Sequence, residues 1–429
     1  MKNKSQLILL VFLSSFLFAL GGEKAFAADS YKLVIGGFDW GAAVQKVILA
    51  NAPSDARPSD FEVFVNRSSS EGEIPENVRS GKRSVIYSYP SDENGNRKQD
   101  GSHLTLVLEV SPVQPLGSPI QYMRVGNRAS NVWIDYQVTV VNTKNRQLWD
   151  QESGRIMPIV DDFELNSTFN YQDKMTLAYA SFSPGNPQPK TPLIIWLHGG
   201  GEGGMDPTIA LLGNRAANYA SDEIQVLFGG AHVLVPQSPT FWMQAKDGTY
   251  TRGDREDVYH EALFALIDEY VKSNPSIDPK RIYVGGCSNG GYMSLKLILE
   301  HPDYFAAGYI SALAYSNEFI SDEQVKSIKN VPIWFVHSAD DNTTKPDVTV
   351  VPLYHRLKEA GAKNVFFSYY DHVTDITGFY GGDDYFYPGH WSWIYSHANT
   401  ARTDFDGSPV MLDGKPVTIM EWLAAQSKK

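Results

Sequence analysis

Residues 282–293 read Ile-Tyr-Val-Gly-Gly-Cys-Ser-Asn-Gly-Gly-Tyr-Met and decide the fold of the second half of the chain. They contain the pattern G-x-S-x-G as Gly286, Ser288 and Gly290, between an apolar run typical of a buried strand and a segment with helical periodicity. Such a strained turn presents a serine hydroxyl at the tip of a strand, and glycines are needed because side chains on either side would collide. We therefore predict Ser288 as a nucleophile. The competing interpretation is a glycine-rich turn packed under a helix.

The regions around this turn alternate between strand and helix patterns. Continuous apolar runs, as expected of strands buried on both faces, occur at 193–197, 233–235, 282–284 and 333–336. Apolar residues recur at helical spacing in 256–273 and 292–299. This alternation predicts a doubly wound, mainly parallel α/β sheet over residues 151–429, with the site at the carboxyl ends of its strands.

The preceding part of the chain has a different rhythm. Short β-type runs separated by turn residues occupy 61–65, 85–89, 104–110 and 132–141, and Asn94-Gly95 is a turn signal between two of them. Only 42–50 has a spacing compatible with a helix. We predict an all-β, Ig-like sandwich domain over residues 28–150.

The first residues indicate the compartment. Lys2 and Lys4 precede an apolar run that ends near Ala25-Phe-Ala27, which is typical of a secretory signal with an A-x-A cleavage site. The run is about 14 residues long, too short to cross a bilayer, so we expect a secreted protein without membrane insertion. Removing residues 1–27 changes the net charge from −12 to about −14, which disfavours nucleic acid as a partner. The single cysteine, Cys287, excludes a disulfide framework and a thiolate metal site.

A second glycine-rich stretch follows the run at 193–197. Residues 198–204 read His-Gly-Gly-Gly-Glu-Gly-Gly and resemble the segment that supplies backbone N–H groups to an oxyanion hole. We expect these donors to be the amides of Gly200 and of Cys287. The stretch also fits the dinucleotide pattern G-x-G-x-x-G, but His198 leads it and Pro207 follows closely, so we disfavour that interpretation and expect no cofactor.

A triad needs an acid and a base after the nucleophile. Asp340 and Asp341 follow the run at 333–336, and spacing alone does not separate them. The competing interpretation is that both are solvated or turn-capping acids. The base must be a histidine further along the chain. His390 and His372 are the foremost of the four candidates, which are His355, His372, His390 and His397.

Aromatic and acidic residues suggest further roles. Trp242 and Trp391, with Phe241 beside the first, are candidates to line a substrate pocket, although core packing is an equally good interpretation. The acidic stretch 371–384 lacks the ligand spacing of a calcium loop, so we expect a solvated loop and no metal site.

Together these motifs resemble bacterial esterases of the polyhydroxybutyrate-depolymerase-like group, whose members include proteins with an Ig-like N-terminal domain. The resemblance implies that Ser288 is the nucleophile, Asp341 the acid and His390 the base. Where members often read G-A-D-D-P-V-V-P, this chain has Ser-Ala-Asp-Asp-Asn-Thr-Thr-Lys-Pro at 338–346, so it departs from the pattern directly after the acid. The motifs that carry the resemblance lie at 38–48, 197–204, 235–243, around Ser288, at 334–341 and at 389–393.

The sequence thus predicts a secreted serine carboxylesterase that hydrolyses ester bonds through a Ser-His-Asp acyl-enzyme mechanism, on a small or polymeric substrate. One alternative is a serine peptidase of the prolyl-oligopeptidase type, whose propeller repeats are absent. The other is a non-catalytic protein that binds a surface or glycan. Homo-oligomerisation through the Ig-like domain is left open.

Overall fold

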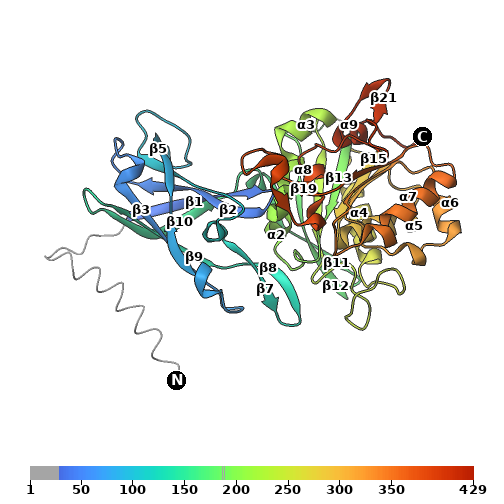
Figure 1. The fold of residues 1–429 in the computed structure, drawn as a ribbon, viewed down its shortest axis with the longest axis horizontal. Coiled ribbons are helices and arrows are strands. Elements are labelled where there is room, and N and C mark those ends of the chain that lie inside the picture. Colours follow the sequence, from blue (N-terminus) through green and yellow to red (C-terminus); the bar gives the residue numbers. More distant parts are fainter. Residues whose placement is uncertain (1–28, 186, 188) are drawn as a thin grey trace.

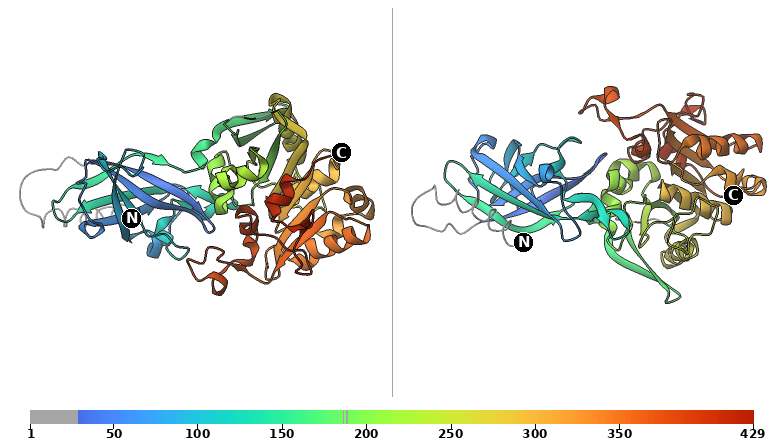
Figure 2. Two further views of the ribbon diagram at one scale, coloured as in Figure 1. Left: turned by 90° about the horizontal axis from the view of Figure 1, so that it is seen from above. Right: turned by 60° about the horizontal axis from the view of Figure 1, so that its bottom comes forward.

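The computed structural model describes residues 29–185, 187 and 189–429. The predicted secretory signal lies outside these residues. Two lobes are joined end to end along the long axis of the molecule, an all-β lobe and an α/β lobe (Figures 1 and 2). No described helix has the length and apolar character needed to span a membrane.

The N-terminal lobe is built on one eight-stranded sheet with the order β4-β3-β9-β10-β1-β2-β6-β5. Inward-facing side chains such as Leu33, Val63, Leu106 and Val140 are fully or almost fully buried and form its core. The last strand, β10, runs beyond the predicted domain boundary at residue 150. The strands of this sheet are β1 (Asp29–Phe38), β2 (Gly41–Ala50), β3 (Phe61–Ser68), β4 (Ser80–Arg83), β5 (Val85–Ser91), β6 (His103–Leu108), β9 (Asp135–Asn142) and β10 (Leu148–Ile156).

Two local predictions for this lobe are wrong. The segment compatible with a helix, 42–50, is strand β2, because β1 pairs along its whole length and buries its β-branched residues. The single run at 132–141 is divided at Ile134, whose N–H donates to Pro119 O outside both strands. Before this break lies a separate two-stranded hairpin, β7 (Ile120–Val125) and β8 (Arg128–Trp133), which leaves the sheet beside the α/β lobe (Figure 1).

The C-terminal lobe confirms the prediction of an α/β-hydrolase-type, mainly parallel sheet. Its order is β11-β12-β14-β13-β15-β16-β17-β18, in which β12 pairs antiparallel with both of its neighbours and all other neighbouring strands pair in parallel. The strands are β11 (Glu164–Tyr171), β12 (Met175–Phe182), β13 (Thr191–Leu197), β14 (His232–Gln237), β15 (Ile277–Cys287), β16 (Ala307–Ser311), β17 (Ile333–Ser338) and β18 (Val365–Tyr370).

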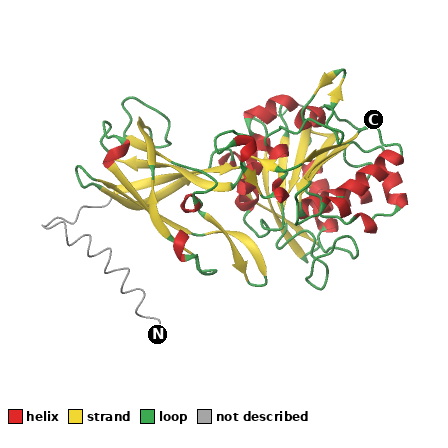
Figure 3. Ribbon diagram, in the orientation of Figure 1, coloured by secondary structure: helices red, strands yellow, loops and turns green. Residues whose placement is uncertain are grey.

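Helices cover both faces of this sheet (Figure 3). Alternate residues of β13 show the two layers, because Ile194 and Trp196 pack into one core cluster while Leu193 and Ile195 pack into the other. The helix at 256–273 begins only at His260, because the Asp257 carboxylate accepts the N–H groups of the first turn. The helices are α2 (Pro207–Leu212), α3 (Asp222–Phe228), α4 (His260–Ser273), α5 (Asn289–Glu300), α6 (Asp322–Ile328), α7 (Val350–Glu359), α8 (Ile394–His397) and α9 (Ile419–Ala424).

The two lobes meet through specific polar and aromatic contacts. Asp39, in the turn between β1 and β2, pairs with Arg215 at 3.2 Å. Trp40 packs edge-on against Tyr380, whose hydroxyl donates to Val110 O at 3.1 Å. The N-terminal lobe is therefore docked on the α/β lobe rather than merely tethered to it.

Candidate active site

Ser288 occupies the turn between β15 and α5, as the sequence predicts. Its φ of 53° and ψ of −112° are strained for a residue with a side chain. A Cβ on Gly290 would lie 1.9 Å from Leu197 O, and one on Gly286 would lie 2.5 Å from Gly290 O, so only glycine fits at both positions. The Ser288 N–H donates to Ser311 O at 3.1 Å. The backbone thus holds the serine at the carboxyl end of β15.

Asp341 and His390 are brought together, although they lie 49 residues apart. His390 Nδ1 lies 2.8 Å from Asp341 Oδ2, and His337 Nε2 lies 3.0 Å from the same oxygen. The N–H groups of Thr343 and Thr344 donate to the other oxygen at 2.8 and 3.0 Å. Burial alone would raise the pKa of Asp341, but the hydrogen bonds from the two imidazoles outweigh it and hold the pKa well below its ordinary value. The carboxylate therefore stays ionised.

Short contacts connect this pair to the nucleophile turn. Thr344 Oγ1 donates to Ala312 O at 3.2 Å and lies 3.3 Å from His390 Nδ1. Ala312 follows Ser311, the residue that receives the Ser288 N–H. Among the described residues the Ser288 hydroxyl has no hydrogen-bond partner, and His390 Nε2 has none either. Serine, imidazole and carboxylate are thus gathered where β15, β16 and β17 end.

The other candidate bases have different environments. His372 Nδ1 pairs with Asp340 Oδ2 at 2.9 Å, but about half of its side chain is exposed. His355 lies exposed on α7. His397 is buried, and its Nδ1–H donates to Asn214 O. Of the four candidate bases, His372 and His390 each pair with an aspartate, and the Asp341–His390 pair is the one joined by Thr344 to the turn that carries Ser288.

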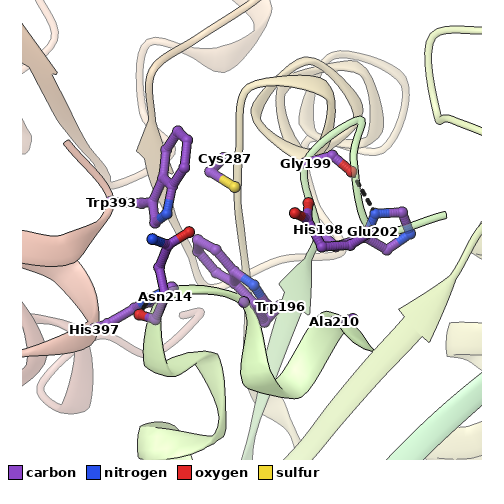
Figure 4. Close-up of a pocket in the computed structure, with 10 residues that line it drawn as sticks. Trp196, His198, Gly199, Glu202, Ala210, Asn214, Cys287, Trp393 and His397 are labelled. Carbon is purple, nitrogen blue, oxygen red and sulfur yellow. Dashed lines mark hydrogen bonds between the residues drawn. The ribbon is translucent and has the colours of Figure 1, made fainter. Parts of the chain in front are cut away.

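The glycine-rich loop after β13 is anchored by His198. This imidazole is buried, which lowers its pKa to about 4 and keeps it neutral. Its Nδ1–H donates to Gly199 O at 2.6 Å (Figure 4). Its Nε2 accepts the N–H of Ser238 at 3.1 Å. A Cβ on Gly200 would lie 2.8 Å from Asn289 Nδ2, so the loop and the start of α5 are in close contact.

Cys287 and Asn289 flank the nucleophile in different ways. Cys287 ends β15 opposite Ser311, and burial raises the pKa of its thiol. It helps to line a cavity with room for at most about one water molecule, beside Gly199 and Trp393 (Figure 4). Asn289 opens α5, and among the described residues its N–H has no partner, as expected at a helix start. Sequence reasoning missed Asn289, although its place directly after the nucleophile was the available signal.

The predicted pocket residues lie mostly in the core. Trp242 is fully buried, with its ring 5.1 Å from that of His198, so it supports the glycine-rich loop from behind. Trp391 is partly buried against Tyr387. Phe241 is almost fully buried and stacks on another aromatic ring. The rings of Trp242 and Phe241 are therefore closed off from solvent, whereas Trp391 keeps part of its surface exposed.

Two exposed tyrosines lie beside the glycine-rich loop instead. Tyr250 is 52% exposed and stacks on Phe241, and its hydroxyl would lie 3.4 Å from a Cβ on Gly200. Tyr122, on strand β7, is 61% exposed, and its ring would lie 3.3 Å from a Cβ on Gly201. Sequence analysis missed both, because no local pattern relates them to the loop.

The acidic segments are organised by donors from the protein itself. The buried Asp375 carboxylate accepts the N–H of Tyr380 at 2.6 Å and that of Gly382 at 3.3 Å, which closes the loop at 371–384. Elsewhere Glu256, His260 and Glu300 are close enough to hold a metal, but Lys296 Nζ already lies 2.8 and 2.7 Å from the two carboxylates. The absence of a metal stays a prediction.

Family models match parts of both lobes. A family model described as the esterase Ig-like N-terminal domain matches residues 30–153, and a model of the prolyl oligopeptidase family matches residues 249–323. The chain is similar to a putative esterase, NocK, of Nocardia uniformis subsp. tsuyamanensis, with 33% identity over 126 residues, 29% of this chain and 34% of that protein. It is also similar to a probable carboxylesterase, SOBER1-like, of Arabidopsis thaliana, with 24% identity over 173 residues, 35% of this chain and 60% of that protein. The chain therefore spans only part of the length of these relatives.

One solved structure matches nearly the whole chain. It is described as a thermostable esterase, with a TM-score of 0.71 and 23% identity, and the match covers 93% of this chain and 99% of that one. This likeness shows the fold, an Ig-like domain followed by an α/β-hydrolase domain.

Proposed function

We propose that this protein is a serine carboxylic-ester hydrolase that works through an acyl-enzyme. The observation that carries the proposal is the fixed His390–Asp341 pair, 2.8 Å apart, beside a strained nucleophile turn. Asp341 holds the Nδ1–H of His390, so the free Nε2 is the basic nitrogen of the ring. Hydrogen bonds between a nucleophile and its base often form only when substrate is bound, which is consistent with the unpaired Ser288 hydroxyl.

The reaction proceeds in two halves. His390 Nε2 takes the proton of Ser288 as Oγ attacks the ester carbonyl carbon, and the carbonyl oxygen becomes an oxyanion. Collapse of this intermediate expels the alcohol, which receives the proton from His390 and leaves an acyl-Ser288. His390 then removes a proton from water, the hydroxide attacks the acyl carbon, and the acid is released as Ser288 recovers its proton. Asp341 stabilises the imidazolium in both halves.

The oxyanion is stabilised by the N–H groups of Gly200 and Asn289. Both are backbone donors without a partner among the described residues, and the two residues are in contact. Asn289 takes the place that sequence analysis gave to Cys287, because it follows the nucleophile and begins the helix. Loss of one such donor costs about 3 kcal/mol of transition-state stabilisation.

A peptidase activity is the second candidate, because the prolyl oligopeptidase model matches residues 249–323, which include Ser288. The same triad would attack an amide. The described lobe in front of the catalytic domain is an Ig-like sheet and not a propeller. A propeller would restrict which peptides reach the active site, and this lobe would not restrict them in that way. Secretion, directed by residues 1–27, and membership of the polyhydroxybutyrate-depolymerase-like group complete the proposal and rest on the sequence motifs.

The test is hydrolysis of p-nitrophenyl acyl esters from acetate to palmitate, with a chromogenic peptide series in parallel. Ser288→Ala and His390→Ala are measured beside the wild type, each with its thermal midpoint to show that it is folded. Ester turnover that falls to about 10⁻⁶ in Ser288→Ala supports the proposal. Turnover of peptides alone would make the protein a peptidase. No turnover of either series by the wild type would favour the non-catalytic binding protein.

A further inference from the structure

The hairpin β7–β8 of the N-terminal lobe binds the glycine-rich loop of the catalytic lobe directly. The backbone N–H of Asn131 donates to Gly201 O at 2.8 Å, and Ser130 Oγ donates to the same oxygen at 3.1 Å. Arg128 Nη2 donates to Gly203 O at 2.9 Å. Positions 128, 130 and 131 of strand β8 therefore bond to the carbonyls of Gly201 and Gly203 in the loop.

A buried carboxyl extends this contact to the base of the loop. Asn131 Nδ2 donates to Glu202 Oε1 at 2.9 Å. The other carboxylate oxygen would lie 2.9 Å from a Cβ on Gly199, and the N–H of Gly199 also points to this carboxylate. Burial raises the pKa of Glu202, whereas the hydrogen bonds from Asn131 and Gly199 lower it. Glu202 thus joins the hairpin to the first glycine of the loop.

These anchors lie on both sides of Gly200. On one side, His198 of the catalytic lobe holds Gly199 O. On the other side, the hairpin holds Gly201 O. A segment so rich in glycine has many accessible conformations, and an oxyanion donor is effective only if it is aimed before the charge develops. On the far side of Gly200, the N-terminal lobe binds Gly201 O, whereas the catalytic lobe binds the loop further along, because Gln237 Nε2 donates to Glu202 O at 2.8 Å.

We propose that the β7–β8 hairpin is a positioning element of the active site, with Asn131 and Arg128 holding the Gly200 N–H in the direction of the oxyanion. This inference rests on the proposed esterase function. It gives the N-terminal lobe a part in the chemical step, since the hairpin acts on the transition state through the loop. Weakening the hairpin contact lowers kcat and leaves the ground-state binding of the ester nearly unchanged.

The first test uses Asn131→Asp and Arg128→Ala, with kcat and KM measured on the best p-nitrophenyl ester. Asn131→Asp keeps the size of the side chain and places a carboxylate against Glu202 in place of the amide donor. We expect kcat to fall about 10- to 100-fold in each variant, with KM changed less than about 3-fold. A misdirected N–H donor loses part of the oxyanion stabilisation that would be lost completely if the donor were deleted. Wild-type kcat in both variants would overturn the proposal.

Two controls match these changes. Tyr380→Phe removes one hydrogen bond at another contact between the same lobes, and Arg124→Ala removes a cation from the same hairpin away from the loop. Both are expected to keep kcat within about 2-fold. An equal loss of kcat in Tyr380→Phe would mean that general loosening of the lobes is responsible, and would overturn the specific role of the hairpin.

The double variant Asn131→Asp with Glu202→Gln provides a rescue. It exchanges donor and acceptor, so the new amide donates to the new carboxylate while its carbonyl oxygen still accepts the Gly199 N–H. Recovery of most of the lost kcat supports positioning through this pair, and a further loss contradicts it.

Binding of an alkylboronic acid, whose tetrahedral adduct with Ser288 places an oxygen in the oxyanion hole, should weaken and recover in parallel with kcat. If the wild type hydrolyses no ester, the esterase proposal itself fails. If the wild type hydrolyses esters and the hairpin variants keep its kcat, only the hairpin proposal fails.

Discussion

His337 Nε2 lies 3.0 Å from Asp341 Oδ2, the same oxygen that receives the Nδ1–H of His390. One carboxylate therefore binds two imidazoles. His390 lies partly exposed on the short 3-10 helix η9 (Gly389–Trp391), whereas His337 is buried within strand β17. His337 thus fixes the carboxylate, and the carboxylate fixes the ring of His390, the proposed base.

This arrangement makes Asp341 the residue that sets the tautomer of His390. We expect Asp341→Asn to lower kcat by about 10⁴-fold with little change in KM, because an amide can donate to Nδ1 and leave the proton on the wrong nitrogen. The matched control is Asp340→Asn, the adjacent acid, which pairs with His372 and should keep kcat within a few-fold. Steady-state kinetics on a p-nitrophenyl ester decide between them, and a larger effect at Asp340 would transfer the role of the acid.

His390 and His372, the partners of Asp341 and Asp340, are expected to differ in the same way in how strongly their substitution lowers ester turnover. His390→Ala should remove nearly all ester turnover, whereas His372→Ala should retain at least about a third, because the side chain of His372 is half exposed and lies away from the contacts to Ser288. Single-turnover kinetics measure the acylation step directly. Activity that survives His390→Ala and disappears in His372→Ala would move the base to His372.

Much of the catalytic fold follows from local sequence patterns. The apolar run at 193–197 predicts a strand buried on both faces, and β13 does send alternate side chains into two cores. The turn at Ser288 is also visible as a local pattern of glycines. The contacts that require Gly286 and Gly290 include Leu197 O of the neighbouring strand β13, so the sequence shows the pattern while the fold supplies its physical cause.

Other features depend on partners that are distant in sequence. The segment 42–50 is a strand because β1 and β6 pair with its two edges, and its own spacing does not reveal this. Asp340 and Asp341 each find a histidine, so spacing could not choose between them. The contact between Asn131 and Glu202 joins two lobes across 71 residues. Such pairings are settled by tertiary packing, which a single sequence does not show.

Two buried histidines, His198 and His397, should make the free energy of unfolding depend on pH. Burial lowers the pKa of His198 to about 4 and that of His397 to about 3, from an ordinary value of 6.5. Between pH 6.5 and these values the unfolded chain binds protons on the two rings that the folded chain does not bind. The free energy of unfolding therefore falls as the pH is lowered from 7 to 5, with each ring contributing up to about 3 kcal/mol by pH 4.

Urea unfolding at several pH values measures this slope. His397→Gln removes one titrating ring and should reduce the slope by about one proton. His355→Gln, the same change at an exposed position on α7, should leave the slope as it is in the wild type. A free energy of unfolding that stays constant from pH 7 to 5 would contradict the neutral state of the two buried rings.

We expect the rings of Tyr122 and Tyr250 to contact large ester substrates and so to affect KM according to substrate size. Their rings lie beside Gly201 and Gly200, and both are more than half exposed, so an ester carbonyl held at the oxyanion donors has these faces next to it. We expect Tyr122→Ala and Tyr250→Ala to raise KM about 5- to 20-fold for naphthyl esters and less than about 2-fold for the corresponding methyl esters, because only the larger group reaches the rings. Loss of contact area at one stacked ring is about 1 kcal/mol or more. The conservative changes Tyr122→Phe and Tyr250→Phe keep the ring and should preserve KM for both substrates. An equal rise of KM for methyl and naphthyl esters would show that the tyrosines act through the loop and not through the substrate.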